Sequence, residues 1–367
     1  MATPTLCDVT LREGDQMPGR SYGIEQRVAA GRALDDLGVE LIQAGFPVTG
    51  ESDRETVRRL ACDADVKARI VALARAVAGD VDAALTAEAD VIEVMVPVSD
   101  LQLGHVLDES RETAFEMLVA AVERVRDGGA TPHVTLVDAF RTEPSALIEA
   151  FERVPDVPTV SLADTVGART PHTVHELLSA LGASVDLSRA GVHFHDDLGV
   201  ATANALAACD HGVGRIDVSV ASLGERAGNA ALEEVVVAGT TDLGVEFGVD
   251  TERVIPACTA VLDELDESVE PRKAVLGREV TEHESGIHTA AMVREPATFE
   301  PFAPADFGGG RRLLFGEGTG RGGARALLER AGVEPTDERV SGLLDALAER
   351  GPVDAEAAID LAESRAE

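Results

Sequence analysis

Two histidines in the stretch GVHFHDD, His193 and His195, have the clearest capacity for metal chemistry in this sequence. In a β-strand, residues i and i+2 point to the same face, so both imidazoles can reach one ion. Two histidines and a carboxylate leave positions open on a divalent cation for a substrate, and Glu13 is the carboxylate that we expect to complete the set. Taken alone, an HxH pair is as readily a polar strand end, and a single glutamate is more often solvated or paired.

Polar side chains follow several apolar segments of the chain, beginning with LCDVTLREGDQMPG at residues 6–19. The first apolar segment is followed by Arg12, Glu13, Asp15 and Gln16, the fifth by Asp138 and Arg141, the sixth by Asp164 and Thr165, and the seventh ends in His193, His195, Asp196 and Asp197. In a parallel barrel, the C-terminal ends of all strands share one mouth. We therefore expect these groups to converge despite their separation in the sequence.

Eight short apolar runs alternate with helical stretches and predict the elements that would position these groups. The runs are residues 5–11, 39–45, 69–74, 90–96, 133–138, 159–164, 191–197 and 215–221. The intervening segments, such as 23–38 and 110–129, repeat apolar residues at intervals of three and four, the period of a helix that covers a sheet. This alternation predicts an α/β fold, a (β/α)8 TIM barrel, although the pattern alone also fits a doubly wound open sheet.

The pattern changes after residue 250. We expect residues 1–250 to form the catalytic barrel and residues 251–367 a small C-terminal helical appendage, which acts as a lid or dimerisation region. Helices are predicted over 251–270, 320–332, 336–349 and 353–365, and the Gly/Pro-rich residues 295–312 indicate irregular chain between them.

The formal net charge of −34 arises from 66 acidic and only 32 basic residues, and it excludes nucleic acid as an expected partner. The acidic residues are spread along the chain rather than gathered in a tail, which indicates a solvated acidic surface. Self-repulsion of this size suits a halophilic protein that concentrated salt keeps folded. A dedicated cationic partner is the alternative.

No apolar run approaches the roughly 20 residues that span a bilayer, and no secretory signal opens the chain, so we expect no membrane partner and a cytoplasmic location. The four cysteines, Cys7, Cys62, Cys209 and Cys258, form no CxxC pair, which makes a zinc knuckle or a disulfide framework improbable. Cys7 lies in the first apolar segment, where a small buried thiol is expected.

Six motifs together carry a family resemblance that covers roughly residues 4–300. They are DVTLREGDQMPG, QAGFPV, ADTVGARTP, HFHDDLGVATANALAA, SLGERAGNAALEE and HESGIH. The chain resembles the metal-dependent Claisen-condensing barrel family of homocitrate, 2-isopropylmalate and citramalate synthases, with hydroxymethylglutaryl-CoA lyase as a more distant relative. VPVSDLQLGHVL is most similar to short homocitrate synthases, whereas AGFP is common to the other two branches.

The resemblance implies roles for individual residues. Glu13, His193 and His195 match the metal ligands, and Asn229 matches a residue near the metal. Arg12 matches an arginine that stabilises developing negative charge and contacts substrate, while Gln16 and Thr165 match positions that hold the 2-oxoacid. His288, in HESGIH, matches a catalytic histidine that the C-terminal region brings over the barrel mouth.

By the same resemblance, the protein is an acyltransferase of amino-acid and carboxylic acid metabolism. It would condense acetyl-CoA with a 2-oxoacid, with a divalent cation such as Mg²⁺, Mn²⁺ or Zn²⁺ as cofactor. The resemblance also implies a homodimer whose subunits exchange the C-terminal region.

Three departures from the family pattern keep other functions open. Val137 stands where relatives often carry a glutamate, Phe299 replaces a common tyrosine, and GEGTG at residues 316–320 lacks the usual lysine and histidine. A lyase or a paralogue that binds a metabolite without turnover therefore remains an alternative, and the motifs leave the acceptor 2-oxoacid open.

The acidic composition generates the first prediction. We expect stability to rise with sodium or potassium chloride into the molar range, because salt screens the repulsion among the 66 acidic side chains. Thermal unfolding midpoints measured across a salt series would check this. An equal midpoint in dilute buffer would contradict the halophilic interpretation.

Overall fold

Eight parallel strands close into a barrel whose order around the ring follows the order in the chain. The computed structural model describes residues 3–63 and 65–364. The strands are β1 Thr5–Asp8, β2 Leu41–Gly45, β3 Arg69–Arg75, β4 Val91–Pro97, β5 Thr131–Val137, β6 Val160–Asp164, β7 Ala190–Phe194 and β8 Arg215–Val218. Because β1 pairs with β8 in parallel, with Cys7 opposite Asp217, the sheet has no open edge. The predicted barrel is confirmed, and the open sheet is excluded.

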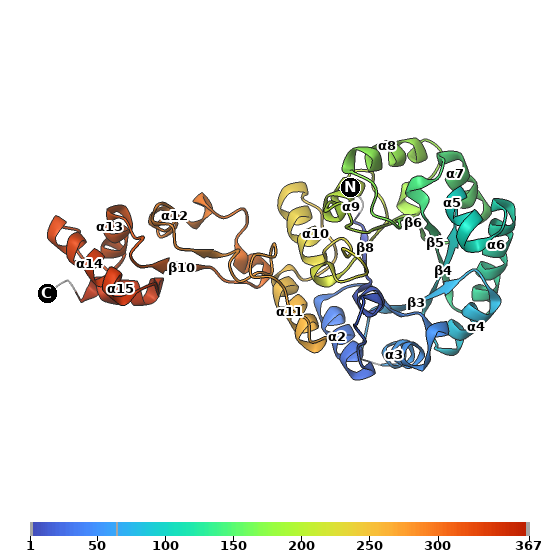
Figure 1. Ribbon diagram of the computed structural model, residues 1–367, viewed down its shortest axis with the longest axis horizontal. Coiled ribbons are helices and arrows are strands. Elements are labelled where there is room, and N and C mark those ends of the chain that lie inside the picture. Colours follow the sequence, from blue (N-terminus) through green and yellow to red (C-terminus); the bar gives the residue numbers. More distant parts are fainter. Residues whose placement is uncertain (1–2, 64, 365–367) are drawn as a thin grey trace. The chain divides into compact units, whose positions relative to one another are not determined.

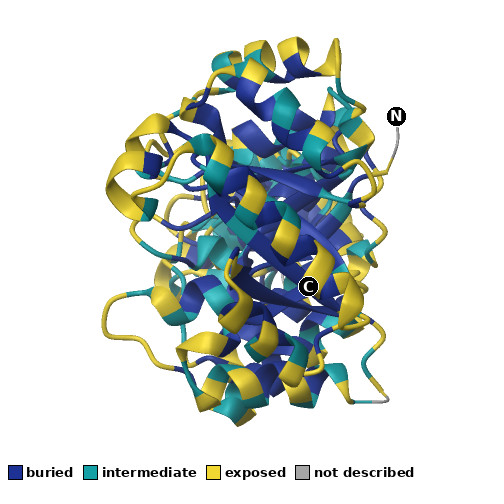
Figure 2. Cartoon of the chain, turned by 90° about the vertical axis from the view of Figure 1, so that its right-hand side faces the viewer, coloured by how far each residue is buried: buried dark blue, intermediate teal, exposed yellow. Residues whose placement is uncertain are grey.

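Helices surround the barrel and cover its outer face (Figure 1). The helices of this part of the chain are α1 Thr10–Glu13, α2 Ile24–Leu37, α3 Glu51–Ala61, α4 Ala78–Thr86, α5 Asp100–Gln102, α6 Arg111–Asp127, α7 Pro144–Arg153, α8 Pro171–Gly182, α9 Ala201–Cys209, α10 Leu232–Ala238 and α11 Val254–Glu264. Figure 2 shows the strands as buried and the outer faces of many helices as exposed. Burial on both faces explains why the strands are nearly continuous apolar runs.

An apolar cluster of buried residues forms part of the barrel core. It consists of Cys7, Val9, Leu41, Val71 and Val91. Leu41, Val71 and Val91 each stand two residues before a residue that lines the central cavity, and they therefore face the interior. Cys7 is a free, fully buried thiol, as expected, and burial raises its pKa.

Inside the barrel, a buried arginine joins three polar side chains. The guanidinium of Arg215 donates to Glu93 at 2.8 Å and to Asp217 at 2.7 Å, and its Nη1 lies 3.1 Å from Nδ1 of His133. The side chains of Arg215 and Glu93 are each only 1% exposed. Although burial opposes the charge of Asp217, Arg215 lowers the pKa of this carboxyl. One guanidinium therefore pairs with two buried carboxylates inside the barrel.

The first compact unit extends to Ser268, and the second begins at Val269, whereas the sequence placed the boundary at residue 250. The difference arises because α11 packs against α2 of the barrel. The backbone amide of Asp250 also donates to the carbonyl of Leu37 at 3.0 Å, and the side chain of Gln26 donates to the carbonyl of Glu264 at 3.0 Å.

The second unit contains the three C-terminal helices that the sequence predicts and a small sheet that it does not. Its elements are β9 Glu282–His283, α12 Gly286–Met292, β10 Arg312–Phe315, α13 Arg321–Arg330, α14 Asp337–Arg350, β11 Val353–Asp354 and α15 Ala355–Glu363. In the sheet, β10 pairs in parallel with β9 and antiparallel with β11. Strands of two to four residues are too short to show a period of two, so the sequence did not indicate them.

Among residues 3–63 and 65–364, no helix combines the length and the apolar character that crossing a bilayer requires.

The buried Arg215 generates the second prediction. Changing Arg215→Met leaves Glu93 and Asp217 buried without their cation, which we expect to cost about 3–5 kcal/mol of unfolding free energy. Urea unfolding at fixed salt would measure the loss. The control is Arg124→Met, which breaks a half-exposed pair with Asp82 and is expected to change stability little. Equal losses in the two variants would show that the interior ion pairs are not needed for folding.

Candidate active site

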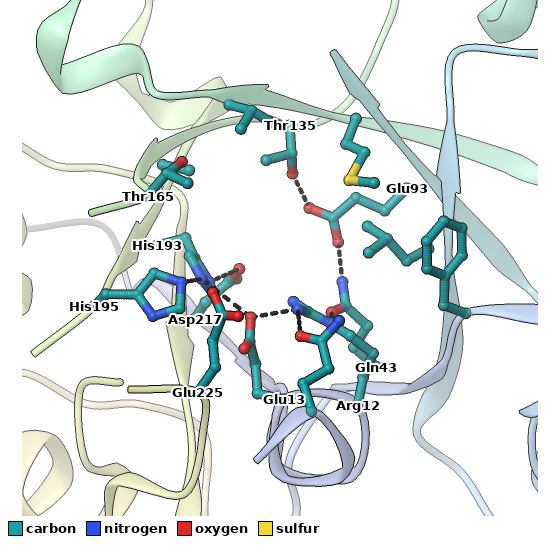
Figure 3. Close-up of a pocket in the computed structure, with 16 residues that line it drawn as sticks. Arg12, Glu13, Gln43, Glu93, Thr135, Thr165, His193, His195, Asp217 and Glu225 are labelled. Carbon is teal, nitrogen blue, oxygen red and sulfur yellow. Dashed lines mark hydrogen bonds and ion pairs between the residues drawn. The ribbon is translucent and has the colours of Figure 1, made fainter. Parts of the chain in front are cut away.

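A cavity of about 200 Å³ opens at the C-terminal ends of the barrel strands (Figure 3). Its lining comes from residues of all eight strands or the segments that follow them. They are Arg12, Glu13, Gln16, Gln43, Phe46, Leu73, Glu93, Met95, Thr135, Val137, Ala163, Thr165, His193, His195, Asp217 and Glu225. Six side chains singled out in the sequence therefore meet here, as the barrel geometry predicts.

Glu13, His193 and His195 bring three ligand atoms together within 4.8 Å of one another. His193 Nε2 lies 3.3 Å from His195 Nε2 and 3.4 Å from Glu13 Oε1. Adjacent ligands of one cation, each about 2.1 Å from it, are about 3.0–3.4 Å apart. All three residues are buried, so the spacing and the donor types fit a divalent cation.

Neighbouring charges prepare two of these groups to act as ligands. Burial alone would raise the pKa of Glu13, yet Arg12 and His193 hold it well below its usual range, so the carboxylate is ionised. Burial and the charge of His193 lower the pKa of His195 to about 3, so this imidazole is neutral. Ionised carboxylates and neutral imidazoles are the forms that bind metals.

His193 is oriented by a second carboxylate behind it. Its Nδ1 lies 3.1 Å from Oδ2 of Asp217, which leaves Nε2 directed toward Glu13 and His195. A carboxylate on the far nitrogen of a metal-binding histidine fixes the tautomer and strengthens the ligand. Burial disfavours a charge on this ring, but the hydrogen bonds to Asp217 and Glu13 outweigh burial and raise its pKa to about 9.

Buried polar atoms without hydrogen-bond partners lie at the candidate metal site. Glu13 Oε2, His195 Nδ1 and Asn229 Oδ1 have no hydrogen-bond partner among the described residues. Because nearly all buried polar atoms in proteins are paired, two orphaned oxygens beside two imidazoles fit a site built to receive a cation.

The loop after β8 brings Asn229 to this site. Asn229 forms an antiparallel bridge with His195, and its Nδ2 lies 3.4 Å from Nε2 of His193. Gly224 leaves room for this side chain, because a Cβ there would lie 2.0 Å from Asn229 Oδ1. Gly228 has a φ of +90° and closes the turn against the carbonyl of Ser222. The loop therefore requires glycine at two positions to place one amide.

A closed ring of polar contacts connects the candidate ligands to the barrel interior. Arg12 contacts Glu13 through Nη1 and donates from Nε to Gln43 at 2.6 Å. Gln43 donates to Glu93 at 2.7 Å, Arg215 joins Glu93 to Asp217, and Asp217 contacts His193. Figure 3 shows the arc from Glu93 through Gln43 and Arg12 to Glu13. Moving any member of this ring disturbs the geometry of the ligands.

Gln16 and Thr165 lie in the lining where the sequence expects them. Gln16 accepts a hydrogen bond from Arg12 Nη1 at 3.2 Å, and the hydroxyl of Thr165 accepts from the backbone amide of Asp138 at 2.8 Å. Both side chains are thus held at the cavity, where they can bind a polar ligand.

The remaining acids of the strand ends stabilise loops instead of lining the cavity. Asp138 binds Arg141 and Ser99, and Asp164 accepts from the backbone amides of residues 168 and 169. Asp15 accepts from the amide of Tyr22 at 2.9 Å, and Asp197 binds Arg226. A residue that follows a strand lies at the barrel mouth, but the conformation of its loop decides whether its side chain points into the cavity.

Sequence reasoning missed several residues that build the site. They are Gln43, Glu93, Thr135, Asp217 and Glu225. Charged or amide side chains inside otherwise apolar strands, such as Glu93 in DVIEVMV and Asp217 in RIDVSVA, were the available signal. A buried charge needs a partner, so such a position points to an interior network.

His288 belongs to the second unit, where its ring stacks on Phe299 with centroids 4.0 Å apart. Phe299, which replaces a tyrosine of the family pattern, is 39% exposed. The catalytic role of His288 stays a prediction.

Comparison with protein families and known proteins agrees with the fold and with the motifs. The HMGL-like family matches residues 3–261, and the homocitrate synthase post-HMGL domain-like family matches residues 275–352. The chain is 41% identical over 339 residues to a homocitrate synthase of Methanopyrus kandleri, which covers 92% of this chain and 85% of that protein. It is 38% identical over 348 residues to a probable 2-isopropylmalate synthase of the same organism, and this match covers 94% of this chain and 69% of that protein.

Among solved structures, the HMG-CoA lyase of Bacillus subtilis resembles this chain with a TM-score of 0.65 at 21% identity. The match covers 74% of this chain and 98% of the lyase. At this identity, the likeness concerns the fold alone.

The clustered ligands generate the third prediction. We expect His195→Ala to lose tight binding of Mn²⁺ or Zn²⁺, and Asp217→Asn to weaken it by about 10–100-fold, because the amide no longer supports the imidazole of His193. Calorimetric titration of chelator-treated protein would measure both. The control, Asp197→Asn, removes an acid that pairs with Arg226 and is expected to leave affinity unchanged. Stoichiometric tight binding by His195→Ala would contradict the assignment.

Proposed function

The chain belongs to the HMGL-like family, and from this membership we propose that it is an acyltransferase that condenses acetyl-CoA with a 2-oxoacid. A divalent cation held by Glu13, His193 and His195 would assist the reaction, with Asn229 beside it. Acetyl-CoA, the 2-oxoacid and water would yield free CoA and a 2-hydroxy acid with one carboxylate more than the acceptor. The names of the relatives, homocitrate synthase and 2-isopropylmalate synthase, support this reaction type.

One observation carries the proposal. Three buried ligand atoms lie within 4.8 Å of one another, next to a permanently charged guanidinium, in a cavity at the barrel mouth. A 2-oxoacid offers a keto oxygen and a carboxylate oxygen side by side, which suits a cation with open positions. The arrangement therefore favours a metal-bound keto acid over a ligand without such a pair.

The cation, when bound, would polarise the keto carbonyl of the acceptor and make its carbon electrophilic. Arg12 supplies fixed positive charge at the same point, because Gln43 and Glu13 hold its guanidinium at the cavity wall. An arginine cannot lose its charge near neutral pH, so it can stabilise the oxyanion that develops as the carbon–carbon bond forms.

Gln16 and Thr165 would orient the acceptor by hydrogen bonds to its carboxylate. Both line the cavity, and Asp138 positions the Thr165 hydroxyl through its backbone amide. Because these contacts reach the end of the molecule that every 2-oxoacid shares, they would bind the whole substrate class and not select within it.

The methyl group of acetyl-CoA must lose a proton before it attacks, and we propose that His288 takes part in this transfer. Family resemblance and the position of His288 in HESGIH support the role. Supply of this residue by the other subunit of a homodimer would make dimerisation necessary for activity.

A thiol-release assay tests the proposed function. Chelator-treated protein is reloaded with Mg²⁺, Mn²⁺ or Zn²⁺ in molar salt and given acetyl-CoA with single 2-oxoacids. We expect CoA release that requires both an acceptor and a cation. Arg12→Ala should lower kcat by about 10²–10³-fold, as loss of an oxyanion-stabilising donor does elsewhere.

The same assay separates the alternatives. Cleavage of hydroxymethylglutaryl-CoA with no CoA release from acetyl-CoA would indicate a lyase. Binding of a 2-oxoacid without any turnover would indicate a non-catalytic paralogue. Recovery of activity on mixing Arg12→Ala with His288→Ala subunits would support a shared site, and no recovery after demonstrated subunit exchange would oppose it.

A further inference from the structure

The cavity at the barrel mouth has two chemically different sides. Strands β7, β8 and β1, with the residues that follow them, carry the charged side, which holds His193, Asp217 and Glu13. Because strand order around the barrel follows chain order, β3, β4 and β5 stand opposite. Their contributions nearest the mouth are Leu73, Met95 and Val137. The side that faces the cation site is therefore largely apolar.

The polar residues of the opposite side lie deeper and are already paired. Glu93 stands two residues before Met95 on the same face of β4, one step farther from the mouth. Its carboxylate accepts hydrogen bonds from Gln43, Thr135 and Arg215. A ligand bound to the cation would thus extend toward Leu73, Met95 and Val137, with the already paired carboxylate of Glu93 beneath them.

This side of the cavity offers no cation to a second carboxylate. Arg12 is the only arginine or lysine in the lining, and its contacts run to Glu13, Gln16 and Gln43 on or near the cation side. A carboxylate placed against the apolar side would be desolvated without a partner, which is strongly unfavourable.

We propose that the acceptor is a 2-oxoacid with an uncharged, apolar side chain, and that Met95 limits the length of that side chain. The inference rests on the proposed function and names its substrate class. It separates acceptors such as pyruvate and 2-oxoisovalerate from diacids such as 2-oxoglutarate, although a relative of this chain is named a homocitrate synthase.

A second cavity explains the role of Met95. It measures about 400 Å³, is mainly apolar, and shares only Met95 and Val137 with the first. These two side chains therefore separate the cavities. Its one arginine, Arg75, is bound to Asp80 at 2.7 Å. Shortening Met95 would join the two spaces and admit a longer apolar chain.

The first test compares acceptors in the thiol-release assay. One pair matches in shape: 4-methyl-2-oxopentanoate carries an isobutyl group where oxaloacetate carries the similarly branched CH₂–COO⁻. Pyruvate, 2-oxobutyrate, 2-oxoisovalerate and 2-oxoglutarate complete the panel. We expect kcat/KM for the best apolar acid to exceed that for either diacid by about 100-fold or more, because the second carboxylate of a diacid would be buried in the site without a partner.

Release with 2-oxoglutarate or oxaloacetate as the preferred acceptor would overturn this inference and leave the proposed function standing. If no acceptor in the panel leads to CoA release, in protein shown to be folded and loaded with the cation, both this inference and the proposed function would be overturned.

The second test examines the separation of the cavities with a matched pair of variants. Met95→Ala is expected to raise kcat/KM for 2-oxohexanoate relative to pyruvate by about tenfold or more, the effect of a few methylenes in an apolar pocket. Met117→Ala enlarges only the second cavity and is expected to leave this ratio unchanged. Thermal midpoints would verify that both variants fold. An unchanged ratio in Met95→Ala, or an equal rise in Met117→Ala, would overturn the role of Met95.

Discussion

Arg215, a fully buried arginine inside the barrel, holds together the polar interior on which the candidate active site depends. Its guanidinium binds Glu93 on one side and Asp217 on the other. From these two carboxylates, contacts run in opposite directions and meet again at Glu13. Because each carboxylate would be unstable in the interior without a cation, the position of Arg215 determines where the others can lie.

These connected polar contacts hold the candidate metal ligands in fixed positions relative to the barrel strands. His193 is held from behind by Asp217, and Arg12 is held by Gln43, which itself rests on Glu93. These side chains belong to strands or to residues directly after strands, so the rigid sheet limits their movement. If Glu13, His193 and His195 bind a cation as proposed, these supports would hold them in place before it binds.

The division of the cavity into a charged side and an apolar side follows from strand order. Barrel closure places β8 opposite β4, so Asp217 of β8 and Met95 of β4 line opposite sides of the cavity. The charged side is suited to the part that all 2-oxoacids share, and the apolar side meets the part in which they differ. In the proposed reaction, selection among acceptors would therefore be separated in space from the groups that activate them.

The sequence by itself determined the eight strands and brought Glu13, His193 and His195 together with Arg12, Gln16 and Thr165 at one cavity, because strand period and motif order are local properties of the chain. It did not reveal the boundary after Ser268 or the short strands of the second unit. It also placed Asp138 and Asp164 at the mouth without indicating that they turn into their own loops. Those features, and the ring through Arg215, were decided only by tertiary structure, since a buried charge finds its partner across the barrel, at a distance in sequence that no local pattern records.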